Sequence, residues 1–358
     1  GNTDSLGSMG LKTALFYVLT SATAIVTGLI IVNLVQPGIA DGQPVGELLA
    51  LTGNAEEIQT RLAGRGLGEI PQMLLRAVPQ NILAAAAANE MLALIFFSGL
   101  FGYFMSQIEH ELAATLYRFT SGVFETMLMI THWVMNFAPY GVFGLVAAVV
   151  AKTGFDAAGP LITFSVAVLV ALIVHMFLTL PLYVRVFARR NPILLFKTVA
   201  PALLTAFSTS SSSATLPVTM DNLETRAGVP NMYTSFVLPL GATVNMNGTA
   251  LYECMAAIFI AQAYGVDLSV TTQFLIVTIA LSTSLGVAAV PSASLVAIAI
   301  ILTAIGLPVE AIGVLLVFDR VLDMSRTATN VFGDAWCTVI VARLQGEDLP
   351  ALDSTGKT

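Results

Sequence analysis

The chain has 358 residues, of which 56% are hydrophobic and only 10% are charged. A soluble domain carries about 25% charged residues, so this chain cannot cover a water-facing surface of the ordinary kind. We therefore predict an all-α, multi-pass protein of the cell (inner or plasma) membrane, with the lipid bilayer as a partner. The net charge of -7 argues against nucleic acid as a partner, and two cysteines make no disulfide framework.

Apolar stretches long enough to cross a bilayer, which takes about 20 helical residues, follow one another along the chain. The first runs from Ala14 to Gln36 and precedes a polar, acidic loop that extends to about Gln72. Further apolar helices are predicted at Met91–Met105, Leu116–Val150 and Ala157–Val184. A basic cluster follows the last helix and comprises Arg185, Arg189, Arg190 and Lys197. By the positive-inside rule this cluster marks a cytoplasmic end, which places the acidic loop outside.

Two segments of the second half resemble each other. Ser208–Pro217 reads STSSSSATLP and Ser282–Pro291 reads STSLGVAAVP, and each places a Ser-Thr-Ser triplet seven residues before a proline. Paired, polar, proline-interrupted hydrophobic segments are typical of inverted repeats whose broken helices meet at the membrane midplane. Half-helix N-termini at such a place would bind an anion. The alternative is that these Ser and Thr residues only join packed helices.

The last hydrophobic segment carries most of the polar chemistry. At 100° per residue one helix face holds Asp323, Arg326, Thr327, Asn330 and Asp334. Charges at membrane depth normally mark a ligand site or a pathway, although Asp323 and Arg326 could also simply neutralise each other. A ligand with an ammonium and an extra carboxylate would use Asp323 and Arg326 separately, because a guanidinium can fork onto a carboxylate.

A third segment, Gly241–Glu253, reads GATVNMNGTALYE. Glycine beside Asn, Thr and Met inside a span predicts an unwound helix whose oxygens can coordinate a hard cation. Glu253 is open to two interpretations, a buried proton carrier or a satisfied polar contact.

Together these motifs resemble the dicarboxylate/amino acid:cation symporter family, which includes the glutamate and aspartate transporters. The resemblance rests on SSSSATLPVT at 210–219, NMNGTALYE at 245–253, VPSASLV at 290–296 and DMSRTATNVFGD at 323–334. It covers nearly the whole chain. It begins in the loop before the family's third helix, so we expect the family's first two helices to be missing.

The resemblance implies a glutamate-transporter-like fold with two re-entrant helical hairpins, broken transmembrane helices and inverted repeats. Residues 1–10 would be a loop and 11–36 helix three of a transport domain. Residues 37–155 would form helices four and five of a scaffold that makes a homotrimer. Residues 156–344 would complete the transport domain with helix six, hairpin one, helix seven, hairpin two and helix eight, and 345–358 would be a tail.

The resemblance also implies a function, which is sodium-coupled symport of an acidic amino acid, glutamate or aspartate, by an elevator mechanism. The implied substrate contacts are Arg326, Asp323, Thr249, Thr327, Asn330, Ser212 and Val290. The implied first sodium site comprises Gly241, Asn245, Asn330 and Asp334. The implied second site comprises Thr243, Met246 and Ser284. The implied third site comprises Tyr17, Thr20, Ser21, Asn245 and Asn247.

The chain departs from the family pattern at Asn247. The family's usual NMDGT is NMNGT here, so the third cation site lacks its carboxylate. We therefore expect sodium at two sites and a weak or empty third. Proton coupling, or a C4-dicarboxylate as substrate, stays open as an alternative.

Two other classes of protein could use the same polar segments. A serine hydrolase could use the serine run, but no GxSxG elbow is present and no histidine lies near it in the sequence. We therefore expect no enzyme activity and no catalytic residues. An anion channel could use the same polar seam, and accumulation of substrate against its gradient would separate a transporter from it.

Overall fold

The computed structural model describes residues 3–49, 51, 78, 81–87, 91–137, 140–141, 143–144, 147, 151, 158–284 and 294–353. These residues fall into two compact units. Unit 1 comprises Gly1–Leu62 and Thr153–Thr358, and unit 2 comprises Ala63–Lys152. The described part of the chain is helical throughout, apart from one two-stranded hairpin, which agrees with the predicted all-α class.

Unit 2 contains α4 (Ile82–Ala87), α5 (Met91–Met105) and α6 (His110–Met135). The bounds of α5 are those predicted from the sequence, whereas α6 begins before the predicted Leu116. Large aromatic side chains stand exposed on both longer helices, for example Phe104 at 59% and Phe119 at 68%. Exposed apolar side chains of this kind indicate a surface that contacts lipid or another protein.

Unit 1 begins with α1 and a small hairpin and then continues from residue 158. The first part contains α1 (Thr3–Val35), β1 (Ile39–Ala40) and β2 (Gln43–Pro44). The middle part contains α8 (Ala158–Val174), α9 (Leu180–Tyr183), α10 (Pro192–Thr209), α11 (Ser212–Asp221) and α12 (Asn231–Val244). The last part contains α13 (Asn247–Ala263), α14 (Val270–Ser284), α15 (Ser294–Ile305) and α16 (Leu316–Leu344). Short π-helical turns at His175–Thr179, Val184–Ala188 and Asn222–Arg226 continue α8, α9 and α11.

Among the described residues, three helices are long and apolar enough to cross a membrane. They are Gly7–Val35, Ala158–Ala188 and Pro192–Thr209. Together with the composition they confirm a multi-pass membrane protein. One boundary differs from the prediction. The segment 1–10 was expected to be a loop, but α1 is helical from Thr3, because nothing between Thr3 and Gly10 breaks a helix strongly enough.

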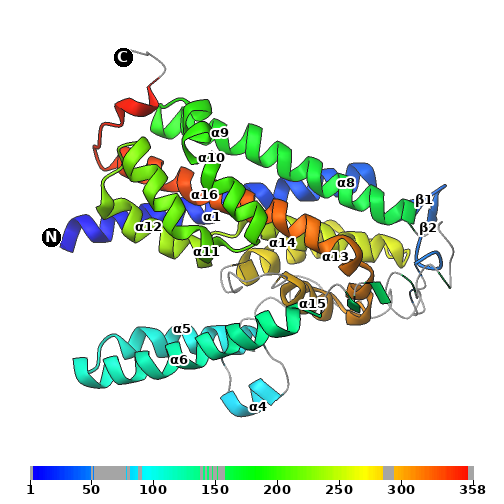
Figure 1. Cartoon of the computed structure of the whole chain (residues 1–358). Helices are drawn as coiled ribbons and strands as arrows, with labels where there is room; N and C mark the ends of the chain where they lie inside the picture. The colour runs from blue at the N-terminus through cyan, green and yellow to red at the C-terminus, as the bar shows by residue number, and fades with distance from the viewer. Residues whose placement is uncertain are drawn as a thin grey trace. The chain divides into compact units, whose positions relative to one another are not determined.

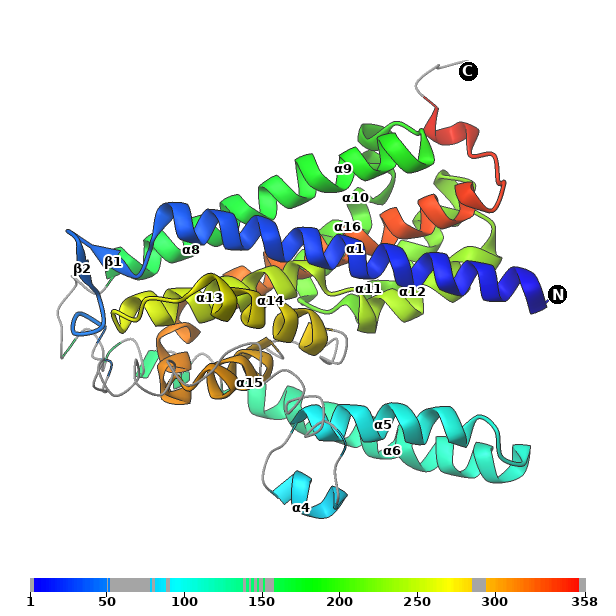
Figure 2. The ribbon, with the colours of Figure 1, turned by 180° about the vertical axis from the view of Figure 1, so that it is seen from behind.

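Two helices form the centre of unit 1. All residues of α13 except Gln262 are buried, and α16 is buried almost continuously from Arg326 to Ala342. Helix α1 packs along α13, as Figures 1 and 2 show from opposite sides. The contact is close because Gly28 has no side chain, since a Cβ there would lie 3.0 Å from Leu251 and Met255. The polar motifs of α13 and α16 therefore lie inside protein rather than in lipid.

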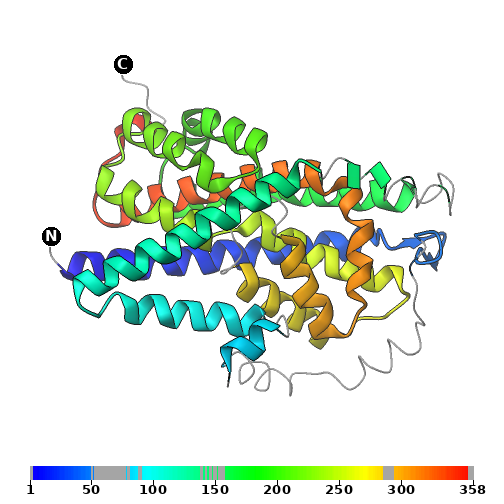
Figure 3. The ribbon, with the colours of Figure 1, turned by 60° about the horizontal axis from the view of Figure 1, so that its bottom comes forward.

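Two helix pairs of unit 1 contain the sequence repeats. Helices α10 and α11 are joined by Ser210 and Ser211, and Ser210 has a left-handed backbone with φ of 52°. Helices α14 and α15 pack on each other, as Figure 3 shows, and the second repeat begins at Ser282 in the last turn of α14. The connection at 285–293, which holds most of that repeat, lies outside the described residues.

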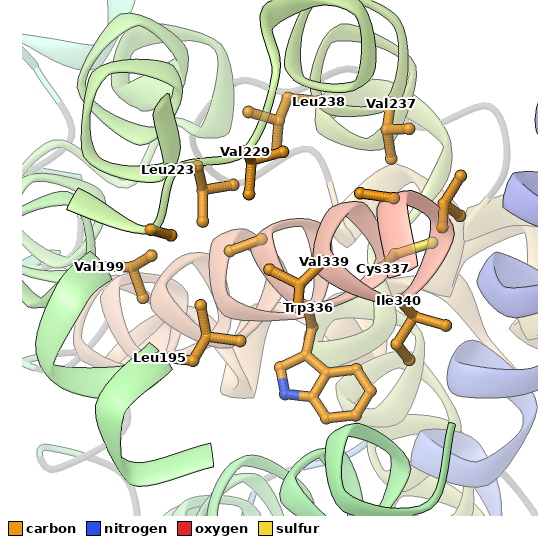
Figure 4. Packing of buried hydrophobic residues seen from close by; sticks show 14 of the residues in the cluster. Leu195, Val199, Leu223, Val229, Val237, Leu238, Trp336, Cys337, Val339 and Ile340 are labelled. Atoms are coloured by element: carbon orange, nitrogen blue, oxygen red, sulfur yellow. The ribbon is translucent and has the colours of Figure 1, made fainter. Parts of the chain in front are cut away.

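An apolar core fixes α16 against α10 and α12. One buried cluster contains Trp336 and Ile340 of α16, Leu195 and Val199 of α10, and Val237 of α12 (Figure 4). Each of these side chains is essentially fully buried, and burial of one large apolar side chain contributes about 1.5–3 kcal/mol. This core holds the polar half of α16 in a fixed register with its neighbours.

Candidate functional site

Arg326 lies at the centre of the polar face of α16. Its side chain is fully buried, and Nη2 donates to Asp319 Oδ1 at 3.0 Å and to Asp323 Oδ1 at 2.8 Å. Its guanidinium carbon lies 3.9 Å from the centroid of the Tyr252 ring of α13, a cation–π contact. Among the described residues, Nε and Nη1 have no hydrogen-bond partner. Nη2 is thus held by protein, and the buried Nε and Nη1 are available as donors to a ligand.

Two carboxylates share the Arg326 guanidinium. Asp319 and Asp323 carry two negative charges against one positive charge when both carboxylates are ionised. A buried charge is costly unless it is paired, and here two carboxylates lie against one guanidinium. The arrangement suits a ligand that brings both a carboxylate and an ammonium.

Asn330 joins α16 to the first turn of α13. Its Oδ1 accepts from the backbone N–H of Gly248 at 2.8 Å and of Thr249 at 3.3 Å. Its Nδ2 donates to Thr249 Oγ1 at 3.0 Å. Gly248 is required here, because a Cβ would lie 2.8 Å from the carbonyl oxygen of Arg326. The structure therefore brings together Asn330 and Thr249, which the sequence assigned to one site.

The helix of the NMNGT motif is interrupted at Asn245 and Met246. These residues have φ and ψ of -105° and 65° and of -95° and 58°, which are not helical. Asn245 Nδ2 donates to Asp334 Oδ1 at 2.9 Å, and Thr20 Oγ1 donates to Asn245 Oδ1 at 3.2 Å. The break therefore lies between α1 and α16, and all three side chains are buried.

Gly241 lets an acidic side chain approach the backbone next to this break. A Cβ on Gly241 would lie 2.5 Å from Asp334 Oδ1 and 2.6 Å from Tyr17 Oη. Tyr17 Oη in turn donates to the carbonyl oxygen of Val237 at 2.6 Å. Carboxylate, amide, hydroxyl and backbone oxygens from α1, α12 and α16 thus converge, and hard cations prefer such ligands.

The family model described as the sodium:dicarboxylate symporter family matches residues 1–344. The chain belongs to the sodium:dicarboxylate symporter family. It is 36% identical over 346 residues to a proton/glutamate-aspartate symporter of Escherichia coli (strain K12), covering 96% of this chain and 78% of that protein. It is 34% identical over 350 residues to a proton/sodium-glutamate symport protein of Bacillus caldotenax, with 97% and 81% covered. It is 33% identical over 391 residues to human excitatory amino acid transporter 3, with 97% and 74% covered.

In this member of the sodium:dicarboxylate symporter family, three predicted substrate contacts remain to be placed, Thr327, Ser212 and Val290. Thr327 Oγ1 donates to the carbonyl oxygen of Asp323 at 2.8 Å, one turn back on α16. Ser212 is buried in the first turn of α11, directly after the junction with α10. Val290 lies outside the described residues.

The residues predicted for a second cation site make local hydrogen bonds in the described structure. Thr243 is exposed, and its Oγ1 donates to the carbonyl oxygen of Leu240 at 3.1 Å. Ser284 is buried, and its Oγ donates to the carbonyl oxygen of Leu281 at 2.9 Å. Met246 is buried at the helix break. No described contact joins these three residues, so the site stays a prediction.

Two residues of the predicted third site carry buried polar atoms without a hydrogen-bond partner among the described residues. Ser21 Oγ and Asn247 Nδ2 have no hydrogen-bond partner among the described residues, and both side chains are fully buried. Asn247 Oδ1 accepts from the backbone N–H of Gly248 at 2.9 Å, and its Nδ2 packs against Gly333. An amide nitrogen thus stands where an aspartate would place an oxygen.

Sequence reasoning missed two partners of Arg326. Asp319 lies seven residues before it, which returns to nearly the same helix face after two turns, so the helical period could have found it. Tyr252 comes from α13 and is adjacent to Glu253 in the NMNGTALYE motif. No local pattern connects Tyr252 with Arg326, because their contact arises from the packing of two helices.

Proposed function

We propose that this chain is a secondary active symporter that moves an acidic amino acid, glutamate or aspartate, across the membrane together with sodium. The observation that carries the proposal is the buried Arg326, which keeps Nε and Nη1 without partners beside Asp323. Nε and Nη1 lie on different edges of the guanidinium, and each offers a charge-assisted N–H donor to a carboxylate oxygen. Membership of the family supports the same conclusion.

The substrate would lie between α16 and the start of α13. Arg326 would bind its side-chain carboxylate, and Asp323 would bind its ammonium. Thr249, Thr327 and Asn330 would complete the pocket, with backbone groups near Ser212 and Val290 at its ends. A C4-dicarboxylate has no ammonium for Asp323 to bind, which favours an amino acid over that alternative.

Sodium would bind where α12 is interrupted. Gly241, Asn245, Asn330 and Asp334 supply the oxygens of one site, and Asp334 supplies a full negative charge. Thr243, Met246 and Ser284 would form a second site. The third site would use Tyr17, Thr20, Ser21, Asn245 and Asn247, and we expect it to be weak, because Asn247 brings no charge.

A proton is the second candidate for coupling, and one observation favours it. Glu253 is fully buried in α13, its Oε2 accepts from Thr283 Oγ1 of α14 at 3.1 Å, and its Oε1 has no partner among the described residues. A buried carboxyl group with one unpaired oxygen is stabilised in its protonated form. The E. coli relative is named a proton/glutamate-aspartate symporter, and the B. caldotenax relative a proton/sodium-glutamate symport protein.

The transport domain would comprise 11–36 and 156–344, and it would move as an elevator against the scaffold at 37–155 in a homotrimer. The division of the chain into two compact units and the exposed aromatic side chains of α5 and α6 support this proposal. In the same scheme α10–α11 and α14–α15 would be the two re-entrant hairpins of an inverted repeat.

Uptake into proteoliposomes tests the function. Labelled glutamate, aspartate and succinate are supplied under an inward sodium gradient, an inward proton gradient, both gradients or neither. We expect glutamate or aspartate to accumulate above its outside concentration only with a cation gradient. Equilibration without accumulation would indicate an anion channel, and release of a cleaved product would indicate an enzyme.

A further inference from the structure

A short segment after α16 turns back and packs against unit 1. We name this segment, Gly346–Asp353, the C-terminal strap. Gly346 has a left-handed backbone with φ of 102°, which turns the chain at the end of α16. Leu349 and Leu352 are fully buried in the core that also contains Leu195 and Val199 of α10. The strap is therefore packed into unit 1, as Figure 1 shows by the red segment beside α10 and α12.

The strap holds the start of α10 through charge and backbone contacts. Arg190, only 9% exposed, lies two residues before α10 and forms ion pairs with Asp348 and, at 2.7 Å, with Asp353. The backbone N–H of Asn191 donates to the carbonyl oxygen of Leu352 at 2.9 Å. Asn191 is also the N-cap of α10, because its Oδ1 accepts from the N–H of Ile193 at 2.9 Å.

The same strap holds the start of α12. Tyr233 Oη donates to Glu347 Oε1 at 3.1 Å. Arg343 fixes Glu347 from α16, since its Nη1 donates to the carbonyl oxygen of Glu347 at 2.8 Å. The start of α12 follows α11 through the turn Asn222–Arg226, whose Glu224 accepts from Asn231 Nδ2 at 2.9 Å.

These contacts lie at both ends of one helix pair. The chain enters the α10–α11 pair at Asn191 and leaves it toward Tyr233, while Ser210 and Ser211 form its turn. We propose that the C-terminal strap is a clamp that fixes both ends of the α10–α11 pair to α16, with Arg190 as its positioning residue. The Ser210–Ser211 turn then rests on a fixed base, and the pair does not pivot as a whole.

A clamp of this kind makes two distant segments respond together. Loss of the Arg190 ion pairs releases the strap, so it loosens the first turn of α12 as well as the first turn of α10. Loss of the Tyr233 hydrogen bond, in turn, loosens α10. Two unrelated local contacts would affect only their own helix, because coupling needs a shared element.

Hydrogen exchange of the full-length protein in detergent tests the clamp. In Arg190→Gln we expect amides of 193–196 and of 231–236 both to exchange about fivefold faster, as for loss of a partly buried ion pair. Tyr233→Phe should accelerate exchange in both segments as well. Arg189→Gln is the matched control, because it removes the same charge from an exposed neighbouring residue, and it should leave both segments unchanged.

Salt and a milder variant keep the test decisive. Choline chloride should accelerate exchange of both segments in the unmodified chain and have no further effect in Arg190→Gln, because screening acts on the ion pairs. Arg190→Lys should give an intermediate rate, since one ammonium cannot fork between two carboxylates. If Arg190→Gln does not fold, Asp353→Asn replaces it. Acceleration confined to 193–196, or equal effects of Arg189→Gln and Arg190→Gln, would overturn the proposal.

Discussion

Asn245 donates from Nδ2 to Asp334 Oδ1 across 2.9 Å, and this hydrogen bond joins the break between α12 and α13 to the buried face of α16. The two residues are 89 positions apart in the sequence. The hydrogen bond from the amide offsets part of the free-energy cost of burying Asp334. It also holds the non-helical backbone at Asn245 beside the Asp334 carboxylate. A cation that binds here would therefore stabilise the junction of α12, α13 and α16.

Gly241→Ala tests this junction. The added Cβ would lie 2.5 Å from Asp334 Oδ1, so the carboxylate must move, at a cost of about 1–3 kcal/mol. We expect the apparent sodium affinity in substrate binding to fall by about tenfold or more. Gly7→Ala is the matched control, because a Cβ there meets nothing within 4 Å. Sodium titrations monitored by calorimetry give the comparison, and equal sodium affinity in both variants would contradict the site.

Arg326→Cys tests the substrate assignment. Removal of one member of a buried charge pair costs about 2–5 kcal/mol, which corresponds to a loss of affinity of about 30-fold or more. We expect uptake of glutamate and aspartate to be lost, and small neutral amino acids to be accepted instead. Arg320→Cys, on an exposed position of the same helix, should leave uptake unchanged. Unaltered glutamate and aspartate affinity in Arg326→Cys would refute the assignment.

Asn247→Asp tests the weak third cation site. At about 4 Å and an effective dielectric of about 20, one added unit charge contributes about 4 kcal/mol of attraction before desolvation offsets it. We expect a higher apparent sodium affinity and one more coupled sodium ion per substrate. Asn136→Asp adds the same charge at an exposed position in unit 2 and serves as the control. The interpretation of Asn247 is wrong if affinity and ion count both stay the same.

Glu253→Gln separates proton coupling from sodium coupling. Glutamine keeps the size of the side chain but cannot release a proton. We expect uptake driven by a sodium gradient to persist and any uptake driven by a proton gradient alone to disappear. Glu310→Gln is the control, because Glu310 is exposed. Measurements at several outside pH values show the effect, and proton-driven uptake that survives in Glu253→Gln would exclude Glu253 as the carrier.

The sequence by itself determined the membrane class, the polar face of α16 and the interruption of α12. Each of these depends on local chemistry. A charged fraction of 10% cannot cover a soluble surface, and helical period alone places Asp323, Arg326 and Asp334 on one face. The start of α1 was predicted less well, because several residues before Gly10 permit helix without demanding it.

Only the tertiary structure decided which distant groups meet. Tyr252 lies under Arg326, and Asn245 reaches Asp334, because α13 and α12 pack against α16 in one particular register. The contact of Arg190 with Asp353 likewise needs the chain to turn back at Gly346. Helical period fixes the direction of a side chain within its own helix. The partner of that side chain is fixed by the packing of the apolar core, which brings distant segments into contact.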